Sequence, residues 1–152
     1  MIGLLLAVAL FNSAAFLINK RLTKNQLVHI WMFTVAVQVL TDSYLKKNHA
    51  YWYFSQGSFE WRALLVLTVL IPPVNIIFLN SYPFGKLFTK RLLYILVWDL
   101  AITAYERIAL LPQPWGYFNY GWWQISYSFL VYPFLLWIVA VYYQWIRKIE
   151  RE

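Results

Sequence analysis

The chain has 152 residues, of which 62% are hydrophobic and 12% are charged, whereas a soluble domain carries roughly 25% charged residues. This composition excludes an ordinary soluble protein and is typical of a chain whose solvent is lipid. The net charge of +7 does not indicate nucleic-acid binding, because the basic residues form separate clusters between apolar runs, and the absence of cysteine excludes disulfides and thiolate chemistry.

Five apolar stretches are long enough to cross a bilayer as helices. They cover residues 2–18, 27–45, 63–84, 91–112 and 123–146. We therefore expect an all-α fold, in which one transmembrane domain over residues 1–152 forms an integral membrane bundle of five helices. Positive charge follows the first stretch rather than preceding it, which predicts an uncleaved span and not a secretory signal.

The basic residues predict the orientation of this bundle. With the N-terminus outside, only Lys46, Lys47 and Arg62 fall in outer loops. Nine basic residues fall on the inner side: Lys20, Arg21, Lys24, Lys86, Lys90, Arg91, Arg147, Lys148 and Arg151. Because Lys and Arg accumulate in cytoplasmic loops, we expect the N-terminus outside and the C-terminus in the cytoplasm. The inner clusters should also attract the anionic headgroups of the bilayer.

A polar face is expected on the second span. Thr34, Gln38, Thr41 and Asp42 recur at helical spacing, so they lie on one side of a helix. Such a face either hydrogen-bonds to neighbouring helices or lines a conduction path or ligand site.

The two outer loops are unusually aromatic. Residues 46–61 are too few and too polar to span, and we expect them to lie in the outer interface as a short amphipathic segment. This loop serves either as an aromatic belt or as a platform for lipid or glycan. The other outer loop, residues 112–122, carries no charge.

The third span contains Pro72 and Pro73 near its middle. Proline has no backbone N–H and clashes with the carbonyl four residues earlier, so the carbonyls of Thr68 and Val69 lose their helical partners. We expect the helix to kink or open there, for packing or as a gate. Thr68 and Asn75 share a face with Pro72 that can satisfy the freed groups.

The fourth span carries Asp99, Glu106 and Arg107 inside an apolar run. A charge near the bilayer centre costs about 2.5–3.5 kcal/mol even on a lenient scale, so each charge must face a partner or water. At about 1.5 Å per residue, Arg107 and Asp42 lie at similar depth, each roughly 22–24 Å from the inner end of its span. We therefore expect Asp42 and Arg107 to form an ion pair.

Asp99, Thr103 and Glu106 then share a face that has no cation of its own. The two acids are roughly 10 Å apart along the helix, which is too far for them to share a proton. Desolvation favours the neutral form of each carboxyl group. The face is either a proton- or cation-handling stripe beside a wet cavity or a polar seam that locks helices together.

The motifs of soluble-type active sites are missing from the sequence. His29 and His49 fall on opposite sides of the predicted membrane, so they cannot share a metal ion. There is no phosphate-binding glycine loop, no Gly-x-Ser-x-Gly and no His-Glu-x-x-His. We expect neither a cofactor nor a metal.

Asn80, Tyr82-Pro83, Glu106 and the segment GYFNYGWWQISYSF at residues 116–129 carry a resemblance to known proteins. In these features the chain is similar to a family of small uncharacterised polytopic membrane proteins from endospore-forming Firmicutes. The resemblance covers roughly residues 59–148. It implies a multi-pass protein of the bacterial cell membrane and brings no catalytic or binding residues.

Two functions agree with these patterns. In the first, the protein moves or senses a small solute or proton through a polar seam between the second and fourth spans, alone or as a homo-oligomer. In the alternative, it is a structural or accessory subunit of a larger membrane assembly and its charges serve packing. A lipid-modifying enzyme is a third class, but no residues mark its site.

The five-span topology makes a prediction that the cysteine-free chain can test. Single cysteines at Ser55 and Asn119 should both react with a membrane-impermeant maleimide on intact cells, because both outer loops face outward. A cysteine at Lys86, in the predicted inner loop, should react only after the membrane is permeabilised. Reaction at only one of the two outer positions would contradict five spans.

Overall fold

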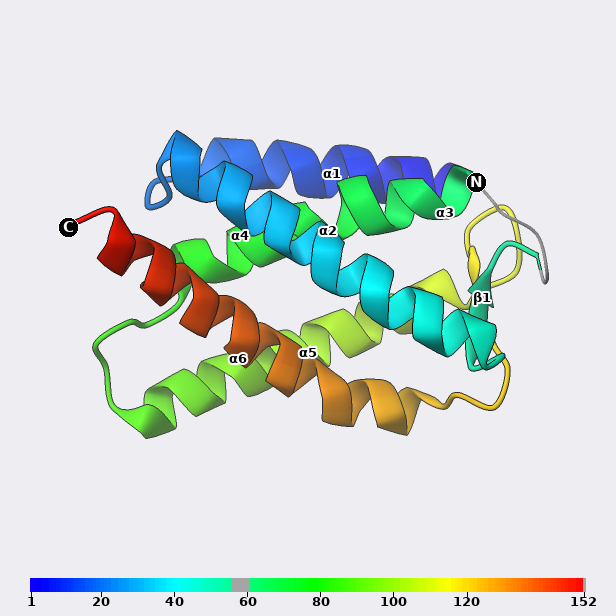
Figure 1. Cartoon of the computed structure of the whole chain (residues 1–152). Helices are drawn as coiled ribbons and strands as arrows, with labels where there is room; N and C mark the ends of the chain where they lie inside the picture. Colours follow the sequence, from blue (N-terminus) through cyan, green and yellow to red (C-terminus); the bar gives the residue numbers. More distant parts are fainter. Residues whose placement is uncertain (56–60, 152) are drawn as a thin grey trace.

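The computed structural model describes residues 1–55 and 61–151, and its fold is mainly helical (Figure 1). Five helical rods are formed by α1 (Ile2–Ile18), α2 (Lys24–Lys47), the continuous run α3 (Trp61–Leu65), η1 (Val66–Leu70) and α4 (Ile71–Ser81), α5 (Phe88–Ala109), and α6 (Ile125–Ile149). Each predicted span corresponds to one rod, and the predicted and observed ends differ by at most three residues. The predicted all-α class is confirmed.

The rods pack side by side, with the two chain ends at opposite ends of the bundle (Figure 1). α4 packs against both α1 and α2, and α6 packs against both α2 and α5. The end that holds the N-terminus also holds the loops after α2 and α5. The segments 20–24, 86–91 and 147–151, which hold the basic clusters, lie at the other end (Figure 1).

Length and composition mark two of the described helices as able to cross a membrane. These are the rod Trp61–Ser81, with mean hydropathy 2.2, and α6, with mean hydropathy 1.8. α1 is also apolar but has 17 residues. α2 and α5 carry charged residues along their length. The expectation of five crossings is thus not established by these properties alone.

Large apolar side chains cover the outside of the bundle. Leu17 of α1 is 82% exposed, Leu40 of α2 is 73% exposed, and Leu93 of α5 and Leu130 of α6 are each 64% exposed. α5 exposes leucines and buries its two acids, which reverses the pattern of a helix on a soluble protein. Apolar surface of this extent marks a face that contacts something other than water.

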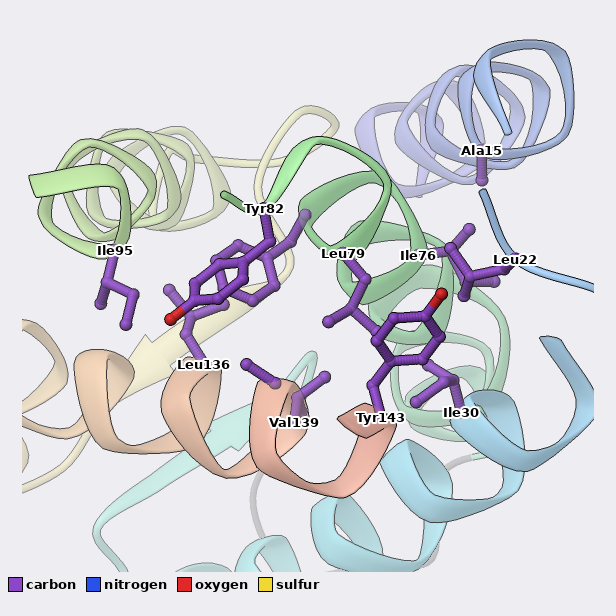
Figure 2. Packing of buried hydrophobic residues seen from close by; sticks show 12 residues of the cluster. Ala15, Leu22, Ile30, Ile76, Leu79, Tyr82, Ile95, Leu136, Val139 and Tyr143 are labelled. Atoms are coloured by element: carbon purple, nitrogen blue, oxygen red, sulfur yellow. The ribbon is translucent and has the colours of Figure 1, made fainter. Parts of the chain in front are cut away.

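The core consists of two clusters, one toward each end of the bundle. In the cluster at the basic end, Tyr143 of α6 lies beside Leu79 of α4 and Ile30 of α2 (Figure 2). The cluster at the other end joins α1 and η1 to the aromatic loops, with Leu4 and Tyr53 among its buried members.

The two aromatic loops meet as a small β-ribbon. Strand β1 (Tyr51–Tyr53) pairs antiparallel with strand β2 (Phe118–Tyr120), with Tyr51 opposite Tyr120. The expected amphipathic segment is therefore wrong for residues 51–53, because strand pairing satisfies backbone groups that an unpaired loop would leave open. Residues 56–60 of that loop lie outside the described residues.

Gly121 permits the close approach that ends this ribbon. Its N–H donates to the Ala50 carbonyl at 2.8 Å, and a Cβ atom placed on it would lie 2.0 Å from the His49 carbonyl oxygen. Any larger residue would push the two loops apart. The loops predicted to share one side are thus joined at one end of the bundle.

At the basic end, side chains join the chain segments between helices. Asn80 Oδ1 accepts the backbone N–H groups of Lys20 and Arg21 at 2.9 and 3.2 Å. Glu150 accepts side-chain amide groups from Asn25 and Gln26, which joins α6 to the start of α2. Those two amide donors lower the pKa of the Glu150 carboxyl group.

Pro72 and Pro73 lie in the third rod, the run of α3, η1 and α4, and the helix opens before them as expected. The carbonyl groups that the prolines free have partners other than those predicted. The five residues before Ile71 form a π-helical turn, η1. The Thr68 carbonyl accepts Trp31 Nε1–H of α2 at 2.9 Å. The Val69 carbonyl accepts Asn12 Nδ2–H of α1 at 3.0 Å. The opened helix thereby binds both neighbouring helices.

Thr68 and Asn75 use their side chains elsewhere. The Thr68 hydroxyl donates to the Leu64 carbonyl at 2.6 Å, within its own rod. Asn75 Nδ2 donates to Thr34 Oγ1 of α2 at 2.9 Å. The predicted role of these two residues is therefore wrong, because donors from α1 and α2 reach the freed carbonyls instead.

We predict that removing one of these donors destabilises the bundle. Trp31→Phe keeps an aromatic ring but leaves the Thr68 carbonyl without its donor, and an unpaired polar group costs about 1–3 kcal/mol. Trp137→Phe, at a tryptophan that is 54% exposed, should change the free energy of unfolding far less. Denaturation of both variants in detergent measures the difference, and equal losses would contradict the assigned role of Trp31.

Candidate ligand cavity beside Glu106

A cavity of about 450 Å³ lies between the two core clusters. Side chains of all five rods and both strands line it, and most of them are apolar. A cavity of this size and character, with a few polar groups directed into it, is the usual form of a small-molecule site.

The polar face predicted on the second span lines this cavity in part. Thr34, Gln38 and Thr41 of α2 are among its lining residues. Thr34 accepts a hydrogen bond from Asn75 of α4, which also lines the cavity. The α2 face therefore both bonds to a neighbouring helix and borders open space.

Glu106 of α5 is the one acid that lines the cavity among the described residues. Its side chain is 5% exposed and accepts three hydroxyl hydrogen bonds. Tyr120 and Ser128 donate to Oε1 at 2.5 and 2.7 Å, and Tyr132 donates to Oε2 at 2.7 Å. These donors come from β2 and α6, so the carboxylate joins three elements.

Trp123 extends this hydrogen-bond network. An indole N–H can only donate, and Trp123 Nε1 donates to Ser128 Oγ at 2.8 Å. Ser128 thus links Trp123 to Glu106, since its own hydroxyl donates to Oε1 at 2.7 Å. Burial raises the pKa of the Tyr120 hydroxyl, and the Glu106 contact raises it further, so Tyr120 remains a protonated donor.

Three hydroxyl groups lie 2.5–2.7 Å from the carboxyl oxygens of Glu106, so both oxygens have a hydrogen-bond partner. The expectation for Glu106 considered desolvation alone. It omitted the hydroxyl groups of β2 and α6, which form hydrogen bonds with the carboxyl group.

The predicted ion pair of Asp42 with Arg107 does not form. Arg107 is exposed in the last turn of α5, where a cation complements the helix dipole. Asp42 is buried beside the hydroxyl groups of Tyr51 and Tyr53, and its Oδ1 atom has no hydrogen-bond partner. Equal depth was a poor guide, because it does not specify which faces of two helices meet.

Asp99 and Thr103 are separated from the cavity that Glu106 borders. Asp99 is 0% exposed, and neither residue is among the cavity-lining side chains. Thr103 Oγ1 donates to Asp99 Oδ1 at 3.4 Å, and Asp99 Oδ2 has no hydrogen-bond partner. The predicted acidic stripe is thus divided between an acid at the cavity and an acid buried in helix packing.

Sequence reasoning missed the residues that hold Glu106. Tyr120, Ser128 and Tyr132 were given no role, although two of them lie in the segment that carried the family resemblance. Ser128 and Tyr132 are four residues apart and so share a face of α6. This pair of hydroxyl groups on one helix face could have been predicted to contact a membrane acid that lacks a cation. Across residues 1–55 and 61–151, no three His, Cys, Asp or Glu side chains gather into a metal site.

We predict that Glu106 tolerates an amide but not a hydrocarbon. Glu106→Gln keeps one oxygen for Tyr120 and Ser128 and places an NH₂ group toward the Tyr132 oxygen, so the bundle should melt close to wild type. Glu106→Leu leaves three hydroxyl groups without their acceptor, at about 1–3 kcal/mol each. Melting in detergent should show a loss of several kcal/mol.

Asp99→Leu is the matched comparison, because Asp99 is buried on the same helix with one long hydrogen bond. It should lose less stability than Glu106→Leu. Equal losses would mean that the hydroxyl groups around Glu106 contribute nothing of their own.

Comparison with known proteins gives no further assignment. No protein-family model, curated protein or solved structure matches the chain.

Proposed function

We propose that the chain is a multi-pass protein of the bacterial cell membrane that binds a small solute in this cavity, as a carrier or as a sensor. The cavity beside Glu106 is the observation that carries the proposal. Glu106 supplies the polar contact, and the apolar walls accept the rest of the solute.

Five crossings are supported by the arrangement of the rods. Each has 17–25 residues, which is the length that a transmembrane helix needs. Exposed apolar side chains on α1, α2, α5 and α6 suit contact with lipid tails. Chain ends at opposite ends of the bundle agree with an odd number of crossings (Figure 1).

The proposed orientation places the β-ribbon outside and the basic end in the cytoplasm, with the N-terminus outside. The basic residues then meet the anionic headgroups of the inner leaflet. Trp115 and Trp122, both 54% exposed near the ribbon, suit the outer interface where tryptophan collects. The resemblance to multi-pass membrane proteins of Firmicutes supports the same location.

The alternative role, an accessory subunit in a larger assembly or homo-oligomer, is favoured by a different observation. Asp42 Oδ1 and Asp99 Oδ2 are buried without hydrogen-bond partners, outside the cavity lining. Acids placed in this way serve helix packing rather than solute contact. The two proposals differ in whether the cavity admits a solute.

Access to the cavity can be measured with single cysteines. A cysteine at Gln38 lines the cavity, whereas one at Thr103 is partly buried away from it. In proteoliposomes, a small methanethiosulfonate reagent should modify the cysteine at Gln38 and leave the one at Thr103 unmodified. If neither reacts while a cysteine at Asn119 does, the cavity is closed and the accessory role replaces the solute-binding role.

A further inference from the structure

The Glu106 carboxylate keeps one unused acceptor position. A carboxylate offers about four lone-pair positions, two on each oxygen. Tyr120 and Ser128 use both positions on Oε1, and Tyr132 uses one of the two on Oε2. The second lone-pair position on Glu106 Oε2 receives no hydrogen bond from the described residues, and Glu106 lines the cavity.

Among the described residues, Glu106 also has no cation beside it to balance the charge of its ionised form. Hydroxyl groups donate hydrogen bonds but carry no positive charge, and no ion pair to Glu106 is formed within the part of the chain that the structure describes. A buried charge without a counter-charge is strongly unfavourable. A cationic ligand would fill the unused acceptor position on Oε2, and it would also supply a positive charge.

The walls of the cavity suit such a ligand. Aromatic side chains contribute a large share of the lining, among them Phe33, Trp98, Tyr105, Tyr117, Phe118 and Trp123. Aromatic faces attract organic cations, and the attraction grows when the cation is desolvated. A bare metal ion fits less well, because hard cations require six or more oxygen ligands and one carboxylate is present.

We propose that the solute is an amphipathic organic cation. Its ammonium group lies against Glu106 Oε2, and its hydrocarbon body lies along the aromatic and aliphatic walls. This inference rests on the proposed function and specifies the substrate class of that site. The volume of about 450 Å³ limits the solute to one small organic molecule.

Two probes that have the same shape but differ in charge show whether binding depends on the positive charge. Benzyltrimethylammonium carries a cationic nitrogen, and neopentylbenzene has carbon in the same position. Binding of radiolabelled benzyltrimethylammonium to the full chain in nanodiscs is measured by equilibrium dialysis, with empty nanodiscs as background. Neopentylbenzene is then added as a competitor.

We expect saturable binding of the cation to wild type and to Asp99→Asn, the control that removes a buried acid outside the cavity. Glu106→Gln should weaken binding at least tenfold. Neopentylbenzene should compete at least tenfold less well than unlabelled cation. If Glu106→Gln does not fold, the difference in binding between the two probes on the wild-type protein still shows whether the cavity prefers a cation.

Equal binding by Glu106→Gln, or equal competition by neopentylbenzene, would overturn the cationic assignment and leave a cavity for neutral solutes. A wild-type chain that binds neither probe also overturns it. Reagent access at a cysteine placed at Gln38 then reports separately on the proposed function, which fails only if that cysteine stays unmodified.

Discussion

Hydrogen bonds to one buried acid, Glu106, organise one half of the structure. Glu106 receives one donor from β2 and two from α6, so its carboxyl group holds α5 to both. Trp123 directs Ser128 toward the carboxylate and so extends the arrangement into the loop before α6. The same arrangement places Glu106 in the lining of the cavity.

The rule that buried polar groups need partners also explains the other half of the bundle. Pro72 and Pro73 free two carbonyl groups, and side chains of α1 and α2 donate to them. These two hydrogen bonds join α1 and α2 to η1. Where partners are complete, as at Thr68 and Val69, the helices are fixed. At Glu106, which lines the cavity, a ligand can add a further hydrogen bond to the one that Tyr132 donates to Oε2.

The parts of the fold that depend on local pattern could be predicted from the sequence. Apolar run length identified the five rods, and proline chemistry identified the Thr68 and Val69 carbonyls as freed. The partners could not be predicted, because Trp31 and Asn12 reach those carbonyls from other helices. Asp42 was assigned to Arg107 on depth alone, and depth does not determine rotation about a helix axis. The β-ribbon was missed because three-residue strands gave no periodic signal.

The central claim is that hydroxyl groups hold Glu106 at the cavity, where we propose that it carries the negative charge that a cationic solute balances. Infrared spectra of the reconstituted protein, wild type minus Glu106→Gln, measure this directly at neutral pH. The account predicts that the difference contains an ionised carboxylate band and no band from a protonated carboxylic acid. A protonated carbonyl band that disappears in the Gln variant would contradict it, because a neutral Glu106 would remove the charge that the cationic solute is proposed to balance.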